Sequence, residues 1–378
     1  MTTGKENQIE GADKIEYPTF KHRMKLILED GTEFQGRSFG AECEVRGEVV
    51  FNTGMTGYVE TLTDPSYRGQ ILVMTYPLQN NYGVPEGPFE SERVQVQGLV
   101  VSRYTHRHSH YAAVKSLGDW LREGGVPAIE GVDTRTLTRH LRENGTIPGW
   151  LLFDGSGLAK SKLKAKGVEM NRAAAEVSLR DIVHYPGSAG APSILVIDTG
   201  VKSNIVRSLL RRGASVVRVP FMAQWEEFVP EADGIVIGNG PGDPRLLGPL
   251  IEKVRRLLAS GKPLFGIFLG HQLMALAAGA RTYKLKYGHR SQNQPVVDRR
   301  TGRAYITSQN HGYAVRGGSI PKGWRSWFEN INDRTNEGLR HSRKPFFSVQ
   351  FHPEAAAGPH DTEFLFDRFL DMVRGSAR

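Results

Sequence analysis

The chain has 378 residues, of which 39% are hydrophobic, so it can bury two ordinary cores and we expect two domains. Its formal net charge is +9, but the basic residues are dispersed and no nucleic-acid-binding motif accompanies them, so we expect no nucleic-acid partner. No apolar run is long enough to span a membrane, and the single cysteine, Cys43, excludes internal disulfides and thiolate metal clusters and is typical of the reducing cytoplasm.

The N-terminal part divides into a polar extension and a first domain. Residues 1–23 are polar, lack the apolar core of a signal peptide and contain acids, so they predict a disordered extension and a cytoplasmic location. From residue 24 to about 155, short strand-like runs alternate with turns, and this predicts a small domain of mixed α/β structure. The predicted strands are Met24–Leu28, Gly47–Phe51, Gln70–Met74 and Gln97–Val101, and the predicted helices are Ser116–Glu123 and Thr134–Arg142.

A polar segment follows, and then the pattern changes. Residues 156–192 carry alternating lysines, then a stretch from Tyr185 to Pro192 rich in Pro, Gly and Ser, and we interpret the range as a linker. Residues 193–378 show continuous apolar strands separated by amphipathic helices, which predicts a mostly parallel, doubly wound sheet with its active loops at the carboxyl ends of the strands. The predicted strands are Ile194–Ile197, Val216–Val219 and Gly234–Ile237, and the predicted helices are Lys202–Arg212 and Arg245–Ala259.

Phe268 stands where the surrounding residues call for a nucleophile. An apolar strand runs from Pro263, a turn carries Phe268 between Gly266 and Gly270, and a helix follows. Small-x-nucleophile-x-small is the nucleophile-elbow pattern, in which glycines permit a strained turn that lifts the central side chain above the sheet. A phenylalanine cannot form a covalent intermediate, so the segment is typical of a hydrolase site without its reacting atom.

Several segments in both halves resemble the small, glutamine-hydrolysing subunit of carbamoyl-phosphate synthase, over nearly the whole chain from about residue 24. The family's elbow reads G-I-C-L-G-H-Q, and only the cysteine differs here. The C-terminal matches are Asn239–Pro244, Ser308–Tyr313 and Phe351–Asp361, and the N-terminal ones are Leu28–Gly31, Gly47–Thr53, Met55–Tyr58, Leu62–Tyr67 and Gly131–Arg135. The N-terminal matches separate this family from other class I glutamine amidotransferases.

The resemblance implies a Cys-His-Glu triad in which Phe268 occupies the nucleophile position, His352 is the base and Glu354 orients it. In extended backbone the i, i+2 spacing across Pro353 places both side chains on one face. The glycines of the Gly240 loop allow close backbone approach to a substrate, and the family carries the oxyanion on such an amide and on that of Leu269. The positions that the family uses to bind glutamine are Gly54, Gly240, Gly242, Leu269, Gln272, Asn310, Gly312 and Tyr313.

The resemblance also implies a large synthetase subunit as partner, docked through residues 24–155, and L-glutamine as substrate. ATP and Mg²⁺ would belong to that partner, so we expect no cofactor and no metal in this chain. Ammonia would pass to the partner for carbamoyl phosphate synthesis, which feeds the pyrimidine and arginine pathways.

Two positions depart from the family. Phe268 replaces the thiol with a larger benzyl group, which removes the nucleophile and points into the space of the carboxamide, so we expect the glutaminase step to be defective. Gly54 stands where many members have a serine. A natural loss, an engineered block and a sequence error are all open for Phe268, because Cys and Phe codons differ by one base.

Two rival functions and one rival site stay open at this level. The chain could be a non-catalytic scaffold or regulatory subunit, or an unrelated hydrolase, which the absent nucleophile argues against. His106, His108 and His110 alternate and could line one strand face as metal ligands, but their segment is polar and has no acidic or thiol partner, so we discount it.

Overall fold

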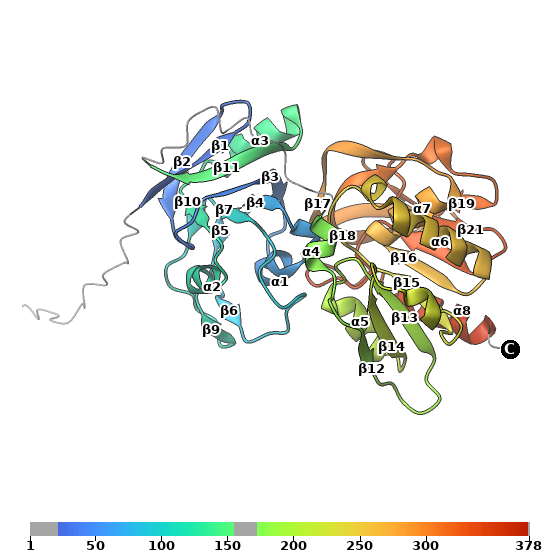
Figure 1. Ribbon diagram of the computed structural model, residues 1–378. Helices are drawn as coiled ribbons and strands as arrows, with labels where there is room; N and C mark the ends of the chain where they lie inside the picture. Colours follow the sequence, from blue (N-terminus) through green and yellow to red (C-terminus); the bar gives the residue numbers. More distant parts are fainter. Residues whose placement is uncertain (1–21, 155–171, 377–378) are drawn as a thin grey trace, which may run out of the picture.

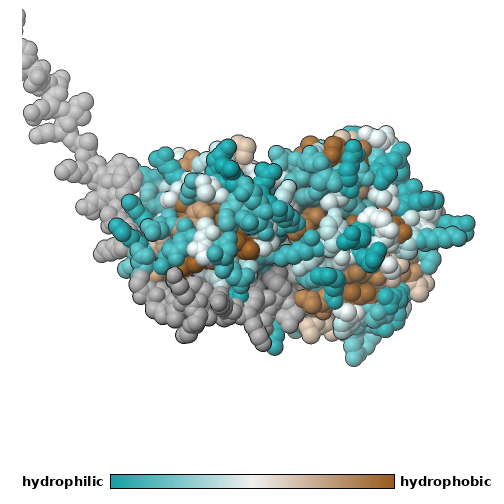
Figure 2. Space-filling view, turned by 90° about the horizontal axis from the view of Figure 1, so that it is seen from above, coloured by the Kyte–Doolittle hydropathy of each residue, from teal (hydrophilic) through white to brown (hydrophobic). Residues whose placement is uncertain are grey.

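The computed structural model describes residues 22–154 and 172–376, and it forms two lobes joined side by side (Figure 1). The extension predicted for residues 1–23 lies almost wholly outside the described residues, as do Lys160, Lys162, Lys164 and Lys166. Figure 2 shows a largely hydrophilic surface with small apolar areas. Within the described ranges, no helix has the length and apolarity needed to cross a membrane.

The N-terminal lobe is a closed barrel, which the alternating strand pattern did not predict. Its strand order is β1-β11-β3-β4-β7-β10-β2, with parallel pairing from β3 through β10 and antiparallel pairing in the rest. Closure lets one set of side chains fill the barrel while the other packs under the helices. The barrel strands are β1 (Arg23–Leu28), β2 (Glu33–Ser38), β3 (Val45–Asn52), β4 (Gln70–Met74), β7 (Gly98–Val100), β10 (Ala128–Glu130) and β11 (Ile147–Phe153).

Two helices of this lobe, α2 (Leu117–Glu123) and α3 (Thr134–Asn144), begin at side-chain caps. The Ser116 hydroxyl accepts from the Asp119 amide at 3.0 Å, and the Asp133 carboxylate accepts from the Thr136 amide at 2.9 Å. Both helices lie where the sequence predicts them. The remaining elements are α1 (Tyr58–Thr63), η1 (Pro65–Tyr67), β5 (Leu78–Gln79), β6 (Val84–Pro85), β8 (Arg103–Tyr104), β9 (Ala113–Lys115), α2 (Leu117–Glu123) and α3 (Thr134–Asn144).

The C-terminal lobe is built on an eight-stranded sheet of order β12-β14-β13-β15-β16-β22-β21-β19. The five strands from β14 to β22 are parallel, as the continuous apolar runs predict, and antiparallel strands flank them. The strands are β12 (Val183–Tyr185), β13 (Ser193–Asp198), β14 (Ser215–Pro220), β15 (Gly234–Ile237), β16 (Leu264–Ile267), β19 (Trp324–Ser326), β21 (Gly338–His341) and β22 (Phe346–Val349).

Helices cover both faces of this sheet. Phe265 packs against Phe366 and Phe369 of α8, and the next residue, Gly266, faces Met274 of α7. Because successive residues of a strand point to opposite faces, α7 and α8 lie on opposite sides, and the sheet is doubly wound. The helices are α4 (Ala173–Val177), α5 (Ser203–Leu210), η3 (Trp225–Phe228), η4 (Pro244–Leu246), α6 (Gly248–Ser260), α7 (Leu269–Ala278), η5 (Gly317–Ser319) and α8 (Phe364–Ser376).

A long hairpin reaches from the C-terminal lobe to the barrel. It consists of β17 (Thr282–Asp298) and β18 (Ala304–Val315), with β20 (Phe328–Asn330) beside β17. The Thr53 amide donates to the Arg290 carbonyl at 3.1 Å, and the Thr146 amide to the Lys286 carbonyl at 3.1 Å. The hairpin therefore holds the two lobes together, as its position between them indicates (Figure 1).

Two predicted boundaries differ from the structure. The range 156–192 that we interpret as a linker contains α4 and β12, and β12 pairs with β14, so the sheet begins about ten residues before the predicted domain start at 193. A three-residue edge strand has too few positions for a recognisable alternation. Helix α6 begins at Gly248 instead of Arg245, because the Asp243 carboxylate caps a separate short turn over Pro244–Leu246.

Candidate functional site

The candidate site lies at the carboxyl ends of three neighbouring parallel strands. Phe268 follows β16, the Gly240 loop follows β15 and His352 lies just beyond β22. These strands are adjacent in the sheet, so segments more than a hundred residues apart in sequence meet at one edge. The sequence predicts this arrangement, and the structure confirms the placement of all three segments.

The elbow has the strained backbone that its pattern predicts. Phe268 has φ of 56° and ψ of −104°, a conformation that non-glycine residues rarely adopt, and the first turn of α7 follows directly. A Cβ on Gly270 would overlap the Ile237 carbonyl oxygen, and one on Gly266 would lie 2.5 Å from the Met274 sulfur. The two glycines are therefore required by close packing around the turn, and the turn holds the residue-268 side chain at the helix N-terminus.

The Phe268 ring fills the space beside the predicted base. It stacks on the His352 imidazole with ring centroids 4.9 Å apart and planes at 28°, and it meets His311 edge-on at 6.1 Å. Only 6% of Phe268 is exposed. A position that would offer a nucleophilic sulfur to a substrate is thus occupied by a packed aromatic ring, which belongs to the apolar core of this lobe.

The predicted base and its orienting carboxylate are in contact. His352 Nδ1 lies 2.7 Å from Glu354 Oε1, and both residues are buried. Burial alone would raise the pKa of Glu354, but the Lys202 ammonium 3.1 Å away and His352 hold it at about 2. Glu354 is therefore a carboxylate at neutral pH, which favours the tautomer of His352 that carries its proton on Nδ1.

The buried ion pair extends to the N-terminal lobe. Lys202 Nζ also lies 4.0 Å from Glu90 Oε2, and Arg207 donates to the other Glu90 oxygen. Burial opposes a charged Lys202, yet Glu354 and Glu90 raise its pKa. The two lobes thus share a charge network that ends at the catalytic carboxylate position.

The other ring nitrogen of His352, Nε2, faces an amide and not residue 268. His352 Nε2 lies 2.7 Å from Asn310 Oδ1, and Asn310 Nδ2 donates to Asp64 Oδ2 at 2.6 Å. Asp64 comes from the N-terminal lobe and lies 3.8 Å from His352 Nε2. Sequence reasoning placed Asp64 only within a family motif, and nothing in its spacing from His352 indicated that the two would meet.

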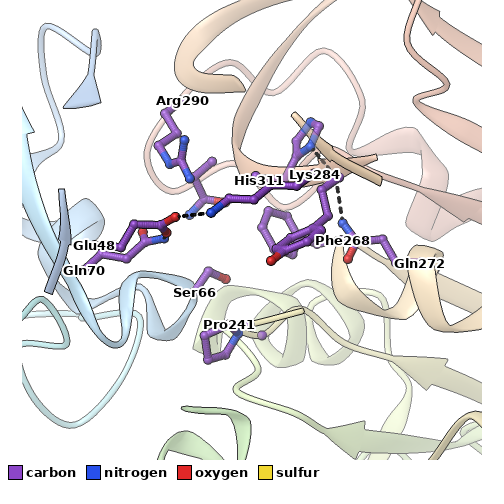
Figure 3. Close-up of a pocket in the computed structure, with 14 residues that line it drawn as sticks. Glu48, Ser66, Gln70, Pro241, Phe268, Gln272, Lys284, Arg290 and His311 are labelled. Atoms are coloured by element: carbon purple, nitrogen blue, oxygen red, sulfur yellow. Dashed lines mark hydrogen bonds and ion pairs between the residues drawn. The ribbon is translucent and has the colours of Figure 1, made fainter. Parts of the chain in front are cut away.

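A pocket adjoins the Phe268 ring at the junction of the lobes. Figure 3 shows Glu48 and Gln70 on the barrel side, Lys284 reaching toward Glu48, and Phe268 with Gln272 on the opposite side. Lys284 Nζ lies 2.7 Å from Glu48 Oε1. Partial burial alone would raise the pKa of Glu48, but the Lys284 and Arg290 charges hold it below its usual value. The lining residues are Glu48, Ser66, Gln70, Gly240, Pro241, Gly242, Phe268, Gln272, Lys284, Arg290, Asn310, His311, Gly312 and Tyr313.

Six of the predicted glutamine-binding residues line this pocket, and two do not. Leu269 begins α7 behind the elbow. Gly54 is not among the pocket residues. Its amide donates to Asn52 Oδ1 at 2.6 Å, and a Cβ there would lie 3.0 Å from the Gln292 amide. A Cβ at 54 would also lie 3.0 Å from Asn52 Oδ1, so a serine there would contact both Asn52 and Gln292. The glutamine-binding roles themselves stay predictions. The sequence did not single out other pocket residues, such as Glu48 and Arg290, because they join the pocket only through the packing of the two lobes.

Two of the three alternating histidines of the N-terminal lobe contact different aromatic rings. His110 lies edge-on to Tyr82 and His106 edge-on to Tyr104, so the rings are held by different aromatic partners. Over the described residues, the single converging group of three or more potential ligands is His289, His311 and Glu337. That His106, His108 and His110 hold no metal stays a prediction.

Comparisons with known proteins match both lobes. The family model for the carbamoyl-phosphate synthase small chain, CPSase domain, matches residues 26–151, and that for class I glutamine amidotransferase matches residues 195–372. The arginine-specific carbamoyl phosphate synthase small chain of Neosartorya fischeri is 46% identical over 366 residues, which cover 94% of this chain and 81% of that protein. The multifunctional protein pyr1-3 of Dictyostelium discoideum is 45% identical over 93% of this chain, which spans 17% of that protein's length.

Proposed function

The chain belongs to the carbamoyl-phosphate synthase small-chain family, with a class I glutamine amidotransferase domain, and from this premise we propose that it serves carbamoyl phosphate synthesis without hydrolysing glutamine itself. Its partner is a large synthetase subunit, to which the barrel lobe docks. ATP and Mg²⁺ act on that subunit. The single cysteine, Cys43, is in keeping with a cytoplasmic location.

The observation that carries the proposal is the stacking of Phe268 on His352 at the elbow. Hydrolysis of a carboxamide by this arrangement needs a nucleophile that loses its proton to His352 and then attacks the carbonyl carbon. A benzyl group supplies no such atom, and loss of a triad nucleophile costs on the order of 10⁶ in rate. The ring also occupies the volume beside the base, so the carboxamide of glutamine has little room to approach.

The rest of the site supports a loss of glutaminase chemistry that is caused by position 268 alone. His352, Glu354 and Lys202 form a buried, ion-paired line that still orients the imidazole. Six of the predicted glutamine positions line one pocket. A chain that had become a scaffold without further constraint would not need this buried charge network, which costs desolvation energy to maintain. We therefore favour a subunit that supports ammonia-dependent synthesis, with a purely regulatory scaffold as the second candidate.

The test compares carbamoyl phosphate formation from glutamine and from ammonium by the chain with its large subunit. We expect ammonium to support synthesis and glutamine to give no glutamate above the rate without protein. The Phe268→Cys variant should gain glutamine-dependent synthesis, and Phe268→Ala should not, because it opens the space without supplying a thiol. Measurable glutamate release by the unmodified chain would contradict the proposed loss. Failure to bind or activate the large subunit would favour the scaffold.

A further inference from the structure

A second cluster of ligand-type side chains lies buried behind the pocket. It contains two imidazoles, one carboxylate and one carboxamide, from the hairpin and from the segment that precedes β21. The four residues are His289 on β17, Gln309 and His311 on β18, and Glu337. All four are buried, and the proposed reaction does not use His289, Gln309 or Glu337.

The inward-facing atoms of these side chains have the spacing of a metal coordination shell. Gln309 Oε1 lies 3.0 Å from both His289 Nδ1 and His311 Nε2. Glu337 Oε1 lies 3.2 Å from His289 Nδ1 and 3.7 Å from His311 Nε2. Four ligands at the 2.0–2.1 Å typical of zinc stand about 3.4 Å apart at the corners of a tetrahedron, so these atoms have room for one ion at their centre.

The outer ring nitrogens are already bonded to oxygen acceptors. His289 Nε2 lies 2.8 Å from Asp333 Oδ2, and His311 Nδ1 lies 2.8 Å from the Tyr313 carbonyl oxygen. A carboxylate or a backbone carbonyl on the outer nitrogen is the usual support of a metal-bound histidine, because it fixes the tautomer and turns the lone pair inward. In both histidines that lone pair would then face oxygen atoms.

With neutral imidazoles the inner contacts bring electron pairs together, and a proton or a metal cation would relieve them. With a proton on Nδ1, a neutral His311 directs the lone pair of Nε2 at the Gln309 and Glu337 oxygens, and with the proton on Nε2 it directs a lone pair at the Tyr313 carbonyl. Either tautomer opposes two electron pairs. Glu337 Oε2 is also buried without a hydrogen-bond partner, although buried carboxylate oxygens normally have one. One positive ion among the four inner atoms removes the first conflict and places a countercharge beside the Glu337 carboxylate.

We propose that His289, His311, Glu337 and Gln309 bind one divalent transition-metal ion, with zinc as the best fit. Two imidazoles with oxygen ligands in a tetrahedral shell match zinc chemistry, and they do not match magnesium or calcium, which take six or more oxygens. The shell is complete and buried, so the ion is structural and does not activate water. It joins β17 and β18 to the segment before β21 and holds the His311 ring that lies edge-on to Phe268.

The first experiment measures metal content of the full-length chain. Protein exposed to zinc sulfate and passed through a chelating column should retain one zinc per chain, and cobalt(II) in its place should give the intense visible absorption of a four-coordinate site. Crystals should show an anomalous zinc peak among the four side chains. Zinc that is sub-stoichiometric, or a peak at any other position, would overturn the proposal.

Variants separate this site from adventitious binding. Glu337→Gln, which keeps the shape of the side chain, should lose stoichiometric zinc, and Asp333→Asn should weaken the affinity about 10–100-fold by removing the support of His289. The matched controls are His360→Ala, an exposed histidine paired with Glu363, and His108→Ala in the N-terminal lobe. Both controls should bind zinc like the unmodified chain. Equal zinc binding by Glu337→Gln would contradict the assignment, and because the anomalous peak is measured on the unmodified chain, poor folding of a variant does not affect that result.

Discussion

The ring of Phe268 lies on the imidazole of His352, with centroids 4.9 Å apart, while Nε2 of His352 lies 2.7 Å from Asn310 Oδ1. The base therefore has an aromatic ring on its face and an amide at its free nitrogen. Its orientation by Glu354 is unaffected, because that contact uses Nδ1. In the proposed function, this arrangement could still activate a nucleophile, and Phe268 does not supply one.

A cysteine at position 268 should be an unusually acidic thiol. In a Cys43→Ala background, the Phe268→Cys thiol is expected to react with iodoacetamide at pH values below its usual pKa of about 8.5, because the α7 N-terminus and His352 stabilise the thiolate. The unmodified chain, with Cys43 alone, is the control, since burial raises the pKa of that thiol. Adding His352→Asn should shift the reactivity back toward higher pH, and an unchanged pH profile would argue against contact between the two side chains.

Lys202 should matter more to stability than a surface lysine. Lys202→Met leaves the buried carboxylates of Glu354 and Glu90 without their shared cation, and breaking such a pair costs about 3–5 kcal/mol. Lys115→Met breaks an exposed pair with Glu123 and should cost about 0–1 kcal/mol. Urea unfolding of both variants measures the difference, and equal losses would show that the buried network contributes little.

The acid side of the stability profile should depend on Glu354. Its pKa is held at about 2 in the folded chain against 4.5 for a free side chain, so its ionisation stabilises the fold fully above about pH 4.5. That contribution is lost as the pH falls from about 4.5 toward about 2, with a slope of up to about 1.4 kcal/mol per pH unit. Melting temperatures between these limits should fall less steeply in Glu354→Gln, whereas parallel curves would refute the assigned pKa.

The elbow should reject a methyl group at Gly270. Gly270→Ala places a Cβ against the Ile237 carbonyl oxygen, so α7 must move away from β15, and we expect a loss of about 1–3 kcal/mol. Gly248→Ala is the matched control, because a Cβ there meets nothing within 4 Å and lies in the first turn of α6. The control should change stability by less than about 1 kcal/mol in either direction. Comparable denaturant midpoints for the two variants would mean that the turn is not tightly packed.

Local patterns in the sequence predict much of the fold. Continuous apolar runs such as Ile194–Ile197 indicate buried parallel strands, and the structure confirms the helices predicted to begin at Ser116 and Thr134 to within one residue. The glycines around Phe268 predict the elbow, because a turn in which backbone segments approach closely requires residues without a side chain. The sequence did not predict the three-residue strand β12, because so short a strand shows no alternation of apolar and polar residues. It did not predict the closure of the barrel either, because closure depends on pairing between distant strands.

By itself, the sequence predicted the two-domain division, the sheet of the C-terminal lobe and the elbow turn around Phe268, because each depends on neighbouring residues. Only the tertiary structure decided which side chains surround that position. It brought Asp64 to Asn310 across 246 residues and His289 to Glu337 across 48, through packing that no local period encodes. The contacts of a site depend on how distant segments meet, and that is set by the free energy of the whole fold.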